Sequence, residues 1–534
     1  MFINICELPS GRRIQHQVCV VGSGPAGMTI ARKLGELGYD VAIMESGSHE
    51  FDERTQALYK GDAPGYEPIY ANRLRYFGGS SNHWAGYCRP FTPGDFVPRE
   101  WIPNAEWPIT YEQIQPYLAP AWEVCSFGRG DPSWLKEHNR KTRRMPPLPL
   151  DDRVFEYTPV QQILARQDEQ NDRNEGISFA TAYGADLEAS QFIHTYLNAN
   201  VTEIHVTEAG DRIDFLEVRT FNAKSFPVRA KVYILACGGI ENARLLLASN
   251  VRHREGLANS SGAVGRNFTD HPIIHAGHLA TADTPHSRVG IHGLSGNFRL
   301  REEVQRAVRL TNGIFNAIPI TDPGYEFAKT SPGVRSFRSL SATLREGSVA
   351  DMARDVMNVA LNFDDVAARV YAKLAPDSIP IESYTIAMKL EMEPTTNNRV
   401  TLSEKVDEFG KPLAKIEFRL SDNDLSTISR SLDLFGQQVG RYRYGRLRKL
   451  IEDRESLAQT FYKFSHHHIG TTRMSSNPGN GVTDGNCRSH DIGNLFIAGS
   501  SVFSTCGSGT PTLMIVALAL RLADYVASHM PRVS

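Results

Sequence analysis

The chain has 534 residues, a formal net charge of −2, 22% charged residues and 41% hydrophobic residues. A chain of this length can form more than one domain, and the composition is that of a globular protein, which excludes collagen-like and intrinsically disordered classes. Because the net charge is close to zero, there is no electrostatic reason to expect binding to nucleic acid or to an anionic membrane.

The two ends of the chain predict neither a signal peptide nor a membrane span. The N-terminal segment contains no apolar stretch of signal-peptide length, and a strand follows the Arg12-Arg13 pair where a twin-arginine signal would have its apolar core. The longest apolar stretch near the C-terminus, residues 513–520, is too short to cross a bilayer and runs into Arg521 and Asp524.

The seven cysteines are scattered, and no two have the Cys-x-x-Cys spacing of metal or redox sites. Iron–sulfur clusters need about four thiolates brought together, and the sequence has no such run. This pattern predicts free thiols, no metal site and a cytoplasmic location.

Residues 17–45 are predicted to form one βαβ unit. A short apolar strand leads into Gly22-x-Gly24-x-x-Gly27, a helix follows, and a second strand ends at Glu45. In dinucleotide-binding folds the first glycine permits the tight turn, the second lets the pyrophosphate approach the backbone, and the third lets helix and strand pack closely. The free N–H groups at the helix N-terminus would face the phosphates.

Glu45 lies at the spacing where a carboxylate accepts the ribose hydroxyls, and it would repel a 2′-phosphate, which disfavours NADP. The alternative is that three glycines mark only a glycine-rich turn. Strand, helix and carboxylate together favour the dinucleotide site, but they do not separate FAD from NAD.

The rest of the chain supplies further pieces of such a site. The predicted elements are, in chain order, a Gly- and Pro-rich aromatic stretch (60–108), helices with long polar loops (110–190), antiparallel strands (204–232), a buried strand ending in glycines (232–239), a helix (241–249), mixed strands and helices without a nucleotide motif (275–460), a buried strand (494–499) and a long helix (511–527). Because the nucleotide-binding pieces are separated, we expect a discontinuous domain with the substrate domain inserted between its parts.

Four further segments carry a family resemblance. They are GGSSNHWAG (78–86), GRNFTDHP (265–272), HHIGTTRM (467–474) and NLFIAGSS (494–501). With the N-terminal glycines, their order and spacing resemble the glucose–methanol–choline (GMC) oxidoreductases over nearly the whole chain, and most weakly from 275 to 460. The first segment looks most like pyranose oxidases and bacterial FAD-dependent sugar dehydrogenases.

This resemblance implies FAD as cofactor and oxidation of an alcohol to a carbonyl. It implies an α/β fold in which a Rossmann-like FAD-binding domain (1–95, 190–274 and 466–534) holds an inserted α+β substrate-binding domain (96–189 and 275–465) with an antiparallel sheet flanked by helices. The positions that match cofactor contacts of the family are Gly22, Gly24, Pro25, Ala26, Gly27, Glu45, Ser46, Gly78, Gly79, Ser81, Asn82, His83, Trp84, Ala85, Val201, Ala236, Cys237, Gly238, Gly499, Ser500, Pro511 and Thr512. Val201, expected after a helix, matches a backbone contact to adenine.

His467 occupies the family's His-x-x-Gly-Thr position, which implies that it is the base. A neutral imidazole can take the alcohol proton because its pKa lies near working pH. If this segment is extended, alternation sends His466 and His468 to the opposite face. The alternatives are a surface cluster, satisfied core histidines or a metal site, but adjacent histidines chelate poorly together and no carboxylate partner is apparent.

Many relatives place an Asn or a second His just before Pro-Thr, where it bonds the same substrate hydroxyl. This chain has Thr510 there, so the usual pair is altered. A threonine hydroxyl still donates or accepts one hydrogen bond, and Thr510 followed by Pro511 is also a good helix start. The dipole of that helix would stabilise negative charge on the reduced flavin, which is a hypothesis from the family's geometry.

His83 has two readings. In pyranose oxidases the matching histidine is bonded covalently to the flavin, whereas other relatives with a His-Trp pair bind it non-covalently. In the second reading, Asn82 and His83 line the edge of the flavin and Trp84 packs beneath it.

The substrate is expected to be a small-molecule alcohol, with a sugar or glycoside hydroxyl favoured and a non-sugar alcohol of secondary metabolism as the alternative. Electrons would leave to oxygen, a quinone or an unknown protein. A flavin-dependent lyase or decarboxylase, or a non-enzymatic flavin-binding subunit, are the rival functions. The sequence leaves the oligomeric state open.

Overall fold

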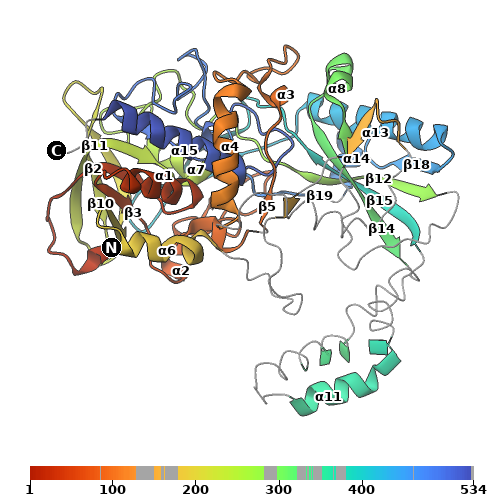
Figure 1. Ribbon diagram of the computed structural model, residues 1–534, viewed down its shortest axis with the longest axis horizontal. Helices are drawn as coiled ribbons and strands as arrows, with labels where there is room; N and C mark the ends of the chain where they lie inside the picture. The colour runs from red at the N-terminus through yellow and green to blue at the C-terminus, as the bar shows by residue number, and fades with distance from the viewer. Residues whose placement is uncertain are drawn as a thin grey trace.

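The computed structural model describes residues 1–84, 86–127, 150–157, 161–162, 178–281, 298–321, 332–333, 336–337, 340, 352–364, 366–367, 381–460 and 462–530. Two large β-sheets lie side by side, each with helices packed on it (Figure 1). Strand segments distant in the sequence meet in both sheets, so the chain passes between them several times.

The first sheet has eight strands in the order β1-β8-β3-β2-β11-β10-β9, with β20 paired to β11. The pairs from β1 to β11 and the β20–β11 pair are parallel, whereas β9, β10 and β11 run antiparallel. The strands are β1 (Phe2–Asn4), β2 (Ile14–Val21), β3 (Val41–Met44), β8 (Ile193–Leu197), β9 (Asn200–Val206), β10 (Ile213–Arg219), β11 (Ser225–Leu235) and β20 (Leu495–Ile497).

The predicted βαβ unit is confirmed as β2, α1 (Pro25–Glu36) and β3. Strand β3 and the second half of β2, from Val18 to Val21, are continuous apolar and buried runs, as expected for parallel strands covered on both faces. The carboxyl ends of β2, β3, β11 and β20 all meet at one edge of the sheet, which is where ligands gather in such folds.

Helix α15 (Thr512–His529) has the length and apolar composition of a membrane-crossing helix, but 56% of it is buried within the protein. It packs against α1 and against α4 (Tyr111–Cys125). The hydroxyl of Tyr39 donates hydrogen bonds to the carbonyls of Ala527 and Met530, at 2.8 and 3.0 Å, and so anchors the C-terminal end of α15. The apolar surface of α15 is therefore used in the core of the first domain.

The second sheet has seven strands in the antiparallel order β18-β12-β15-β14-β13-β6, with β19 paired to β12. Helix α13 (Asp422–Arg441) packs on it through Phe435, whose ring stacks 5.1 Å from Phe298. The strands are β6 (Phe155–Tyr157), β12 (Ile273–Thr281), β13 (Phe298–Leu300), β14 (Gly313–Thr321), β15 (Ile381–Leu390), β18 (Gly445–Lys449) and β19 (Tyr462–Lys463).

The remaining elements are smaller. The remaining strands are β4 (Gly61–Asp62), β16 (Arg399–Val406) and β17 (Pro412–Glu417) in a three-stranded sheet, and β5 (Tyr87–Cys88) with β7 (Gln161–Gln162). The other helices are α2 (Glu53–Ala57), α3 (Pro93–Phe96), α6 (Phe179–Ala189), α7 (Gly238–Ala248), α8 (Glu302–Val308), α11 (Met352–Leu361), α14 (Arg454–Ala458) and the 3₁₀ turns η1 (Ile5–Glu7), η2 (Gly79–Asn82) and η4 (Ser500–Val502).

The predicted fold class is confirmed: a Rossmann-like sheet joined to an antiparallel sheet with flanking helices. Two details differ from the sequence expectation. Helices α4 and α6 lie within the range assigned to the substrate domain, yet they pack on α15 and α1 of the nucleotide domain. Val201 follows strand β8 and lies in β9, so the helix expected before it is wrong.

Candidate active site

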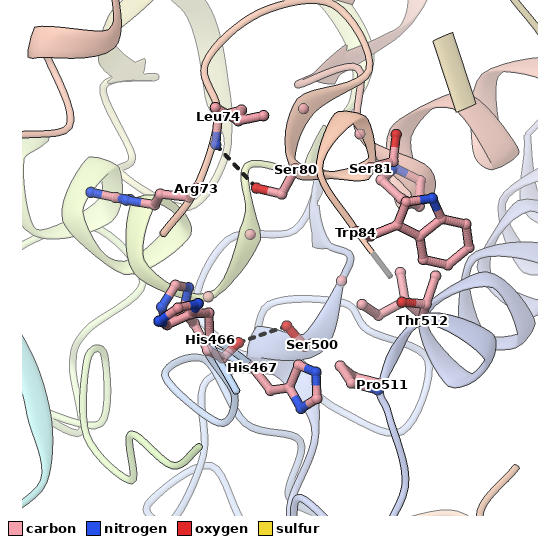
Figure 2. Close-up of a pocket in the computed structure, with 18 of the residues that line it drawn as sticks. Arg73, Leu74, Ser80, Ser81, Trp84, His466, His467, Ser500, Pro511 and Thr512 are labelled. Atoms are coloured by element: carbon pink, nitrogen blue, oxygen red, sulfur yellow. Dashed lines mark hydrogen bonds between the residues drawn. The ribbon is translucent and has the colours of Figure 1, made fainter. Parts of the chain in front are cut away.

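A cavity of about 750 Å³ is lined by residues from both sheets. On one side it meets the carboxyl ends of β2, β3 and β11, and on the other it meets β12, β14 and β15. Figure 2 shows His467 and Ser500 near the start of α15, at Pro511 and Thr512, whereas Arg73 and Leu74 lie across the cavity. Three of the four segments that carried the family resemblance, 78–86, 467–474 and 494–501, therefore converge on one space.

Most of the predicted contact residues line this cavity. They are Gly22, Gly24, Pro25, Ala26, Glu45, Ser46, Gly79, Ser81, His83, Trp84, Val201, Ala236, Cys237, Gly238, His467, Gly499, Ser500, Thr510, Pro511 and Thr512. Gly27, Gly78 and Asn82 do not line it, and Ala85 lies outside the described residues.

The three glycines of the N-terminal motif have different surroundings. A Cβ on Gly22, whose φ is +100°, would lie 2.7 Å from the Ala236 carbonyl oxygen, and one on Gly27 would lie 2.0 Å from the Gly22 carbonyl oxygen. Gly24, at the N-cap of α1, has no atom within 4 Å of its Cβ position. Two glycines are thus required by packing, and the third leaves open space at the helix N-terminus, which fits a bound pyrophosphate.

Glu45 lines the cavity next to this turn. Its carboxylate accepts hydrogen bonds from the Ser23 amide at 3.1 Å, the Ser23 hydroxyl at 2.6 Å and the Gly47 amide at 2.9 Å. These bonds hold the carboxylate at the end of β3, where a ribose hydroxyl would approach. The residues present therefore fit the adenosine end of a dinucleotide such as FAD.

The segment around η2 only partly matches its prediction. Asn82, expected at the flavin edge, instead donates from Nδ2 to the Phe77 carbonyl at 2.9 Å and holds the turn together. Ser81 likewise donates to the Gly78 carbonyl at 2.7 Å, although it also borders the cavity. His83 is exposed to the cavity, and Trp84 packs edge-on against Phe179, with ring centroids 6.0 Å apart.

A buried ionic network beside the cavity was not predicted, because no sequence motif marks its residues. Arg73 and Arg75 lie 3.4 and 3.2 Å from the carboxylate of Glu241, and Arg244 lies 2.6 Å from it. Although burial opposes ionisation, these three arginines lower the pKa of Glu241 to about 2. Arg73 also covers the ring of Tyr59 at 3.8 Å. Since a buried charge without its partner is costly, the network fixes the loop that borders the cofactor end of the cavity.

The three consecutive histidines have three different environments. His466 has a left-handed backbone with φ of +59° and contacts Glu67 at 2.6 Å. His468 is buried and stacks on Phe268, with ring centroids 6.0 Å apart. Because the backbone at His466 is not extended, the expected alternation is wrong, and His467 alone of the three contacts His271.

His271 and His467 form a buried imidazole pair that the sequence did not predict. Their Nδ1 atoms are 2.9 Å apart, and the Nε2 of His271 lies 2.8 Å from the Gly507 carbonyl oxygen and 3.2 Å from that of Cys506. A carbonyl oxygen only accepts, so Nε2 of His271 carries a hydrogen. Burial and the nearby Lys389 lower the pKa of His271 to about 3, which keeps it neutral and leaves Nδ1 as an acceptor.

This tautomer dictates the state of His467. Its Nδ1 must donate to His271, and its Nε2 then carries a lone pair and makes no hydrogen bond to any described residue. Burial, followed by the charge of Lys389, lowers the pKa of His467 well below the usual value for histidine. The neutral, proton-accepting form of His467 is therefore the stable one.

Asp270 holds the backbone of the same loop. One carboxylate oxygen accepts from the amides of His271 and His467 at 2.6 and 2.8 Å, and the other accepts from the amide of His466 at 3.1 Å and from the hydroxyl of Tyr66. Asp270, His271 and His467 lie close enough to ligate a metal, so the expectation that no carboxylate is near the histidines is wrong. The Nδ1 atoms of the two histidines and both oxygens of Asp270 are engaged in hydrogen bonds.

Thr510 lines the cavity but does not cap a helix. Helix α15 begins at Thr512, with Pro511 as its N-cap, and the Thr510 hydroxyl is buried without a hydrogen-bond partner among the described residues. The interpretation of Thr510 as a side-chain N-cap is wrong, because α15 has Pro511 as its N-cap and no side chain makes a capping hydrogen bond to it. The start of α15 does line the cavity, as expected for a helix whose dipole acts on a bound group.

Comparisons with known proteins agree with this site. Two family models, both described as GMC oxidoreductase, match residues 173–273 and 394–519. The fructose dehydrogenase large subunit of Gluconobacter japonicus is 23% identical over 98% of this chain and 99% of its own. The 2-methyl-1,2-propanediol dehydrogenase of Mycolicibacterium austroafricanum and the 6'''-hydroxyparomomycin C oxidase of Streptomyces lividus are each 24% identical over 96% of this chain, and over 95% and 91% of their own.

Solved structures share the fold. Pyridoxine 4-oxidase from Mesorbium loti superposes with a TM-score of 0.57 at 17% identity, covering 97% of this chain and all of its own. A formate oxidase variant from Aspergillus oryzae superposes with a TM-score of 0.56 at 18% identity, covering 98% and 99%. With the two family models and the converging motifs, the chain belongs to the GMC oxidoreductases, an FAD-binding family, and is an oxidoreductase that acts on CH–OH donors.

Proposed function

We propose that this enzyme oxidises a hydroxyl group of a sugar or glycoside to a carbonyl, with His467 as the base. The observation that carries the proposal is the His467–His271 pair, which leaves Nε2 of His467 as a free proton acceptor in the cavity that also holds the dinucleotide turn. The names of relatives that act on fructose and on hydroxyparomomycin C support a sugar substrate.

In the proposed reaction, the substrate hydroxyl donates its proton to Nε2 of His467. His467 then becomes an imidazolium that donates from Nδ1 to His271, which stays neutral and donates from Nε2 to the Gly507 carbonyl. FAD, when bound, supplies the acceptor for the hydride from the carbinol carbon. The residues that line the cavity would hold the alcohol beside His467 and limit the access of water.

An anaerobic screen tests this proposal. Sugars, glycosides and simple alcohols are added to the flavin-loaded enzyme, and loss of flavin absorbance is followed. We expect reduction by at least one sugar or glycoside. A flavin that no alcohol reduces would contradict the proposal and would favour lyase chemistry on the same fold.

The variant His467→Ala should slow flavin reduction by about two to four orders of magnitude, in line with general-base catalysis. His529→Ala is the matched control, because His529 is exposed near the end of α15 and does not line the cavity. Reduction of the His467 variant at the normal rate, with FAD bound, would rule out His467 as the base.

We also propose that the flavin is bound non-covalently, with His83 lining its edge. Acid precipitation separates this from the covalent alternative. We expect the yellow colour to stay in the supernatant, whereas colour in the pellet that disappears in His83→Ala would establish the bond.

A further inference from the structure

Three potential metal ligands meet at the edge of the first sheet that lies away from the cavity. His16 lies near the start of β2, Asp40 immediately precedes β3, and His194 is the second residue of β8. These neighbouring strands are parallel, so their starts share one edge and their carboxyl ends share the other. Val21, at the end of β2, lines the cavity. At a rise of about 3.3 Å per residue, the stretch from His16 to Val21 separates the two edges by about 17 Å.

The three side chains converge on one carboxylate oxygen. Nδ1 of His16 lies 2.8 Å from Oδ1 of Asp40, and Nε2 of His194 lies 3.3 Å from the same oxygen. The centroids of the two imidazole rings are 4.9 Å apart. Ligands held tetrahedrally at about 2.0–2.1 Å from a zinc ion lie about 3.3 Å from one another. The atoms are therefore close to the spacing of ligands that share one small ion.

The fold holds these ligands in place. The carbonyl of Asp40 accepts hydrogen bonds from the amides of Gln17 and Val18, both at 3.1 Å, and its amide donates to Oε1 of Gln17 at 2.9 Å. The second ring nitrogen of His16, Nε2, lies 3.0 Å from the hydroxyl of Tyr196. A metal-bound histidine usually donates its other ring N–H to such a partner, which fixes the tautomer and the orientation of the ring.

The site also has the charge and the access that a cation needs. Among the described residues, the carboxylate of Asp40 has no basic partner besides the two histidines, and Asp40 is the only polar contact of the His194 ring. The side chains of His16 and His194 are 8% and 24% exposed, whereas that of Asp40 is 41% exposed. An ion can therefore enter from the side of the carboxylate, where water would complete its coordination.

Two other groups of potential ligands are less suited to an ion. The Nδ1 atoms of His271 and His467 bond to each other, and the oxygens of Asp270 accept backbone amides. In the group that contains Glu203, the ammonium of Lys411 lies 2.5 Å from that carboxylate, and its charge would repel a second cation.

We propose that His16, Asp40 and His194 bind a divalent transition-metal ion of the zinc type. Two imidazole nitrogens and one carboxylate oxygen suit Zn²⁺ better than Mg²⁺ or Ca²⁺, which prefer oxygen ligands only. The ion replaces the hydrogen that His16 and Asp40 share, and it joins β2, β3 and β8 at the edge opposite the cavity. Because it binds the assembled ligands of the folded chain, it stabilises the first sheet. The cysteine pattern did not point to this site, because its ligands come from histidines and a carboxylate on separated segments.

The test is metal binding to the tag-free, flavin-loaded enzyme after treatment with a chelator. Zn²⁺ is titrated into the enzyme at neutral pH in a calorimeter, with Mg²⁺ as the comparison, and the melting temperature is measured with and without each ion. We expect one saturable site for Zn²⁺ per chain and a higher melting temperature with Zn²⁺ only. An enzyme that shows no saturable binding of Zn²⁺, or that binds Mg²⁺ equally well, would overturn the proposal.

Variants assign the site to its ligands. Asp40→Asn keeps the shape and one acceptor oxygen but removes the charge, and His194→Ala removes one ligand. We expect each to weaken Zn²⁺ binding by about a hundredfold or more, the share of one ligand in a structural zinc site. Tyr196→Phe should weaken binding about ten- to a hundredfold, because the bound His16 loses its hydrogen-bond partner. His529→Ala is the control, because His529 is exposed and belongs to none of the three groups.

Co²⁺ provides a spectroscopic readout that a purely structural effect of a variant would not produce. Bound tetrahedrally by nitrogen and oxygen, Co²⁺ absorbs at longer wavelengths than oxidised flavin, so its band should appear in the unaltered enzyme and disappear in Asp40→Asn. Zinc binding that survives His194→Ala but is lost in His467→Ala or Glu217→Gln would place the ion in another group and refute the proposal. Equal FAD content and equal melting temperatures of the metal-free variants exclude misfolding as the cause of a loss.

Discussion

His271 offers the sharpest test of how the base is prepared. In His271→Leu, the Nδ1–H of His467 loses its acceptor in a buried place, and the imidazolium formed during the reaction loses a charge-assisted hydrogen bond. Such a bond contributes about 1.5–3 kcal/mol, which corresponds to a loss of about ten- to a hundredfold in rate. The tautomer is also released, so part of the population would carry its proton on Nε2, where it cannot act as a base.

The conservative variant His271→Gln gives the control. Its side-chain oxygen can accept from Nδ1 of His467, and its amide can donate to the Gly507 carbonyl, which are the two bonds of the native imidazole. Stopped-flow flavin reduction over a range of substrate concentrations separates the limiting rate from the apparent dissociation constant. We expect the limiting rate of reduction to fall in the Leu variant and to recover partly in the Gln variant. The apparent dissociation constant should change little in either variant.

Two results would refute this reasoning. One is a Leu variant that holds FAD and is reduced at the normal rate, which would mean that His271 does not set the state of His467. The other is a Gln variant as slow as the Leu variant while both keep the native melting temperature. That result would assign His271 a packing role only.

Other predictions follow from the same contacts. Because the pKa of His467 is held well below the usual histidine value, the rate of flavin reduction should stay constant as pH falls from 7 through about 6.5, and a decline centred near 6.5 would contradict this. The unfolded chain binds a proton at His271 between about pH 6.5 and the folded value of about 3, so the free energy of unfolding should fall as pH drops through that window, measured by urea denaturation. Thr510→Val should slow reduction much less than His467→Ala, since the Thr510 hydroxyl has no partner to lose among the described residues; a comparable loss would instead assign it to substrate binding.

The dinucleotide end of the site could be predicted because its residues lie close together in the sequence. The roles of Gly22, Gly24 and Gly27 were predicted from a turn only six residues long. The structure leaves no room for a Cβ at Gly22 or Gly27 and has open space at Gly24. The position of Glu45 beside the turn could be predicted because the second strand of the βαβ unit ends there. Short-range geometry of this kind is encoded in residue spacing, and sequence reasoning captures it.

The environment of the base was not predictable, because it depends on contacts between distant segments. His271 lies 196 residues before His467, and its other ring nitrogen is fixed by carbonyls more than 230 residues away. The segment GRNFTDHP was recognised as a family motif, but nothing in its spacing shows that Asp270 would accept hydrogen bonds from three histidine amides or that His271 would contact the ring of His467. Lys389 left a faint signal, as a single cation inside an apolar strand that pairs on both sides.

Lys389 and the base are electrostatically coupled. Lys389 is, after burial, the largest cause of the lowered pKa of His467, so its positive charge makes His467 a poorer proton acceptor. Replacing Lys389 by Met should therefore raise the pKa of His467, so that the acid limb of flavin reduction moves to higher pH. An acid limb that stays in place would show that the charge of Lys389 does not reach the base.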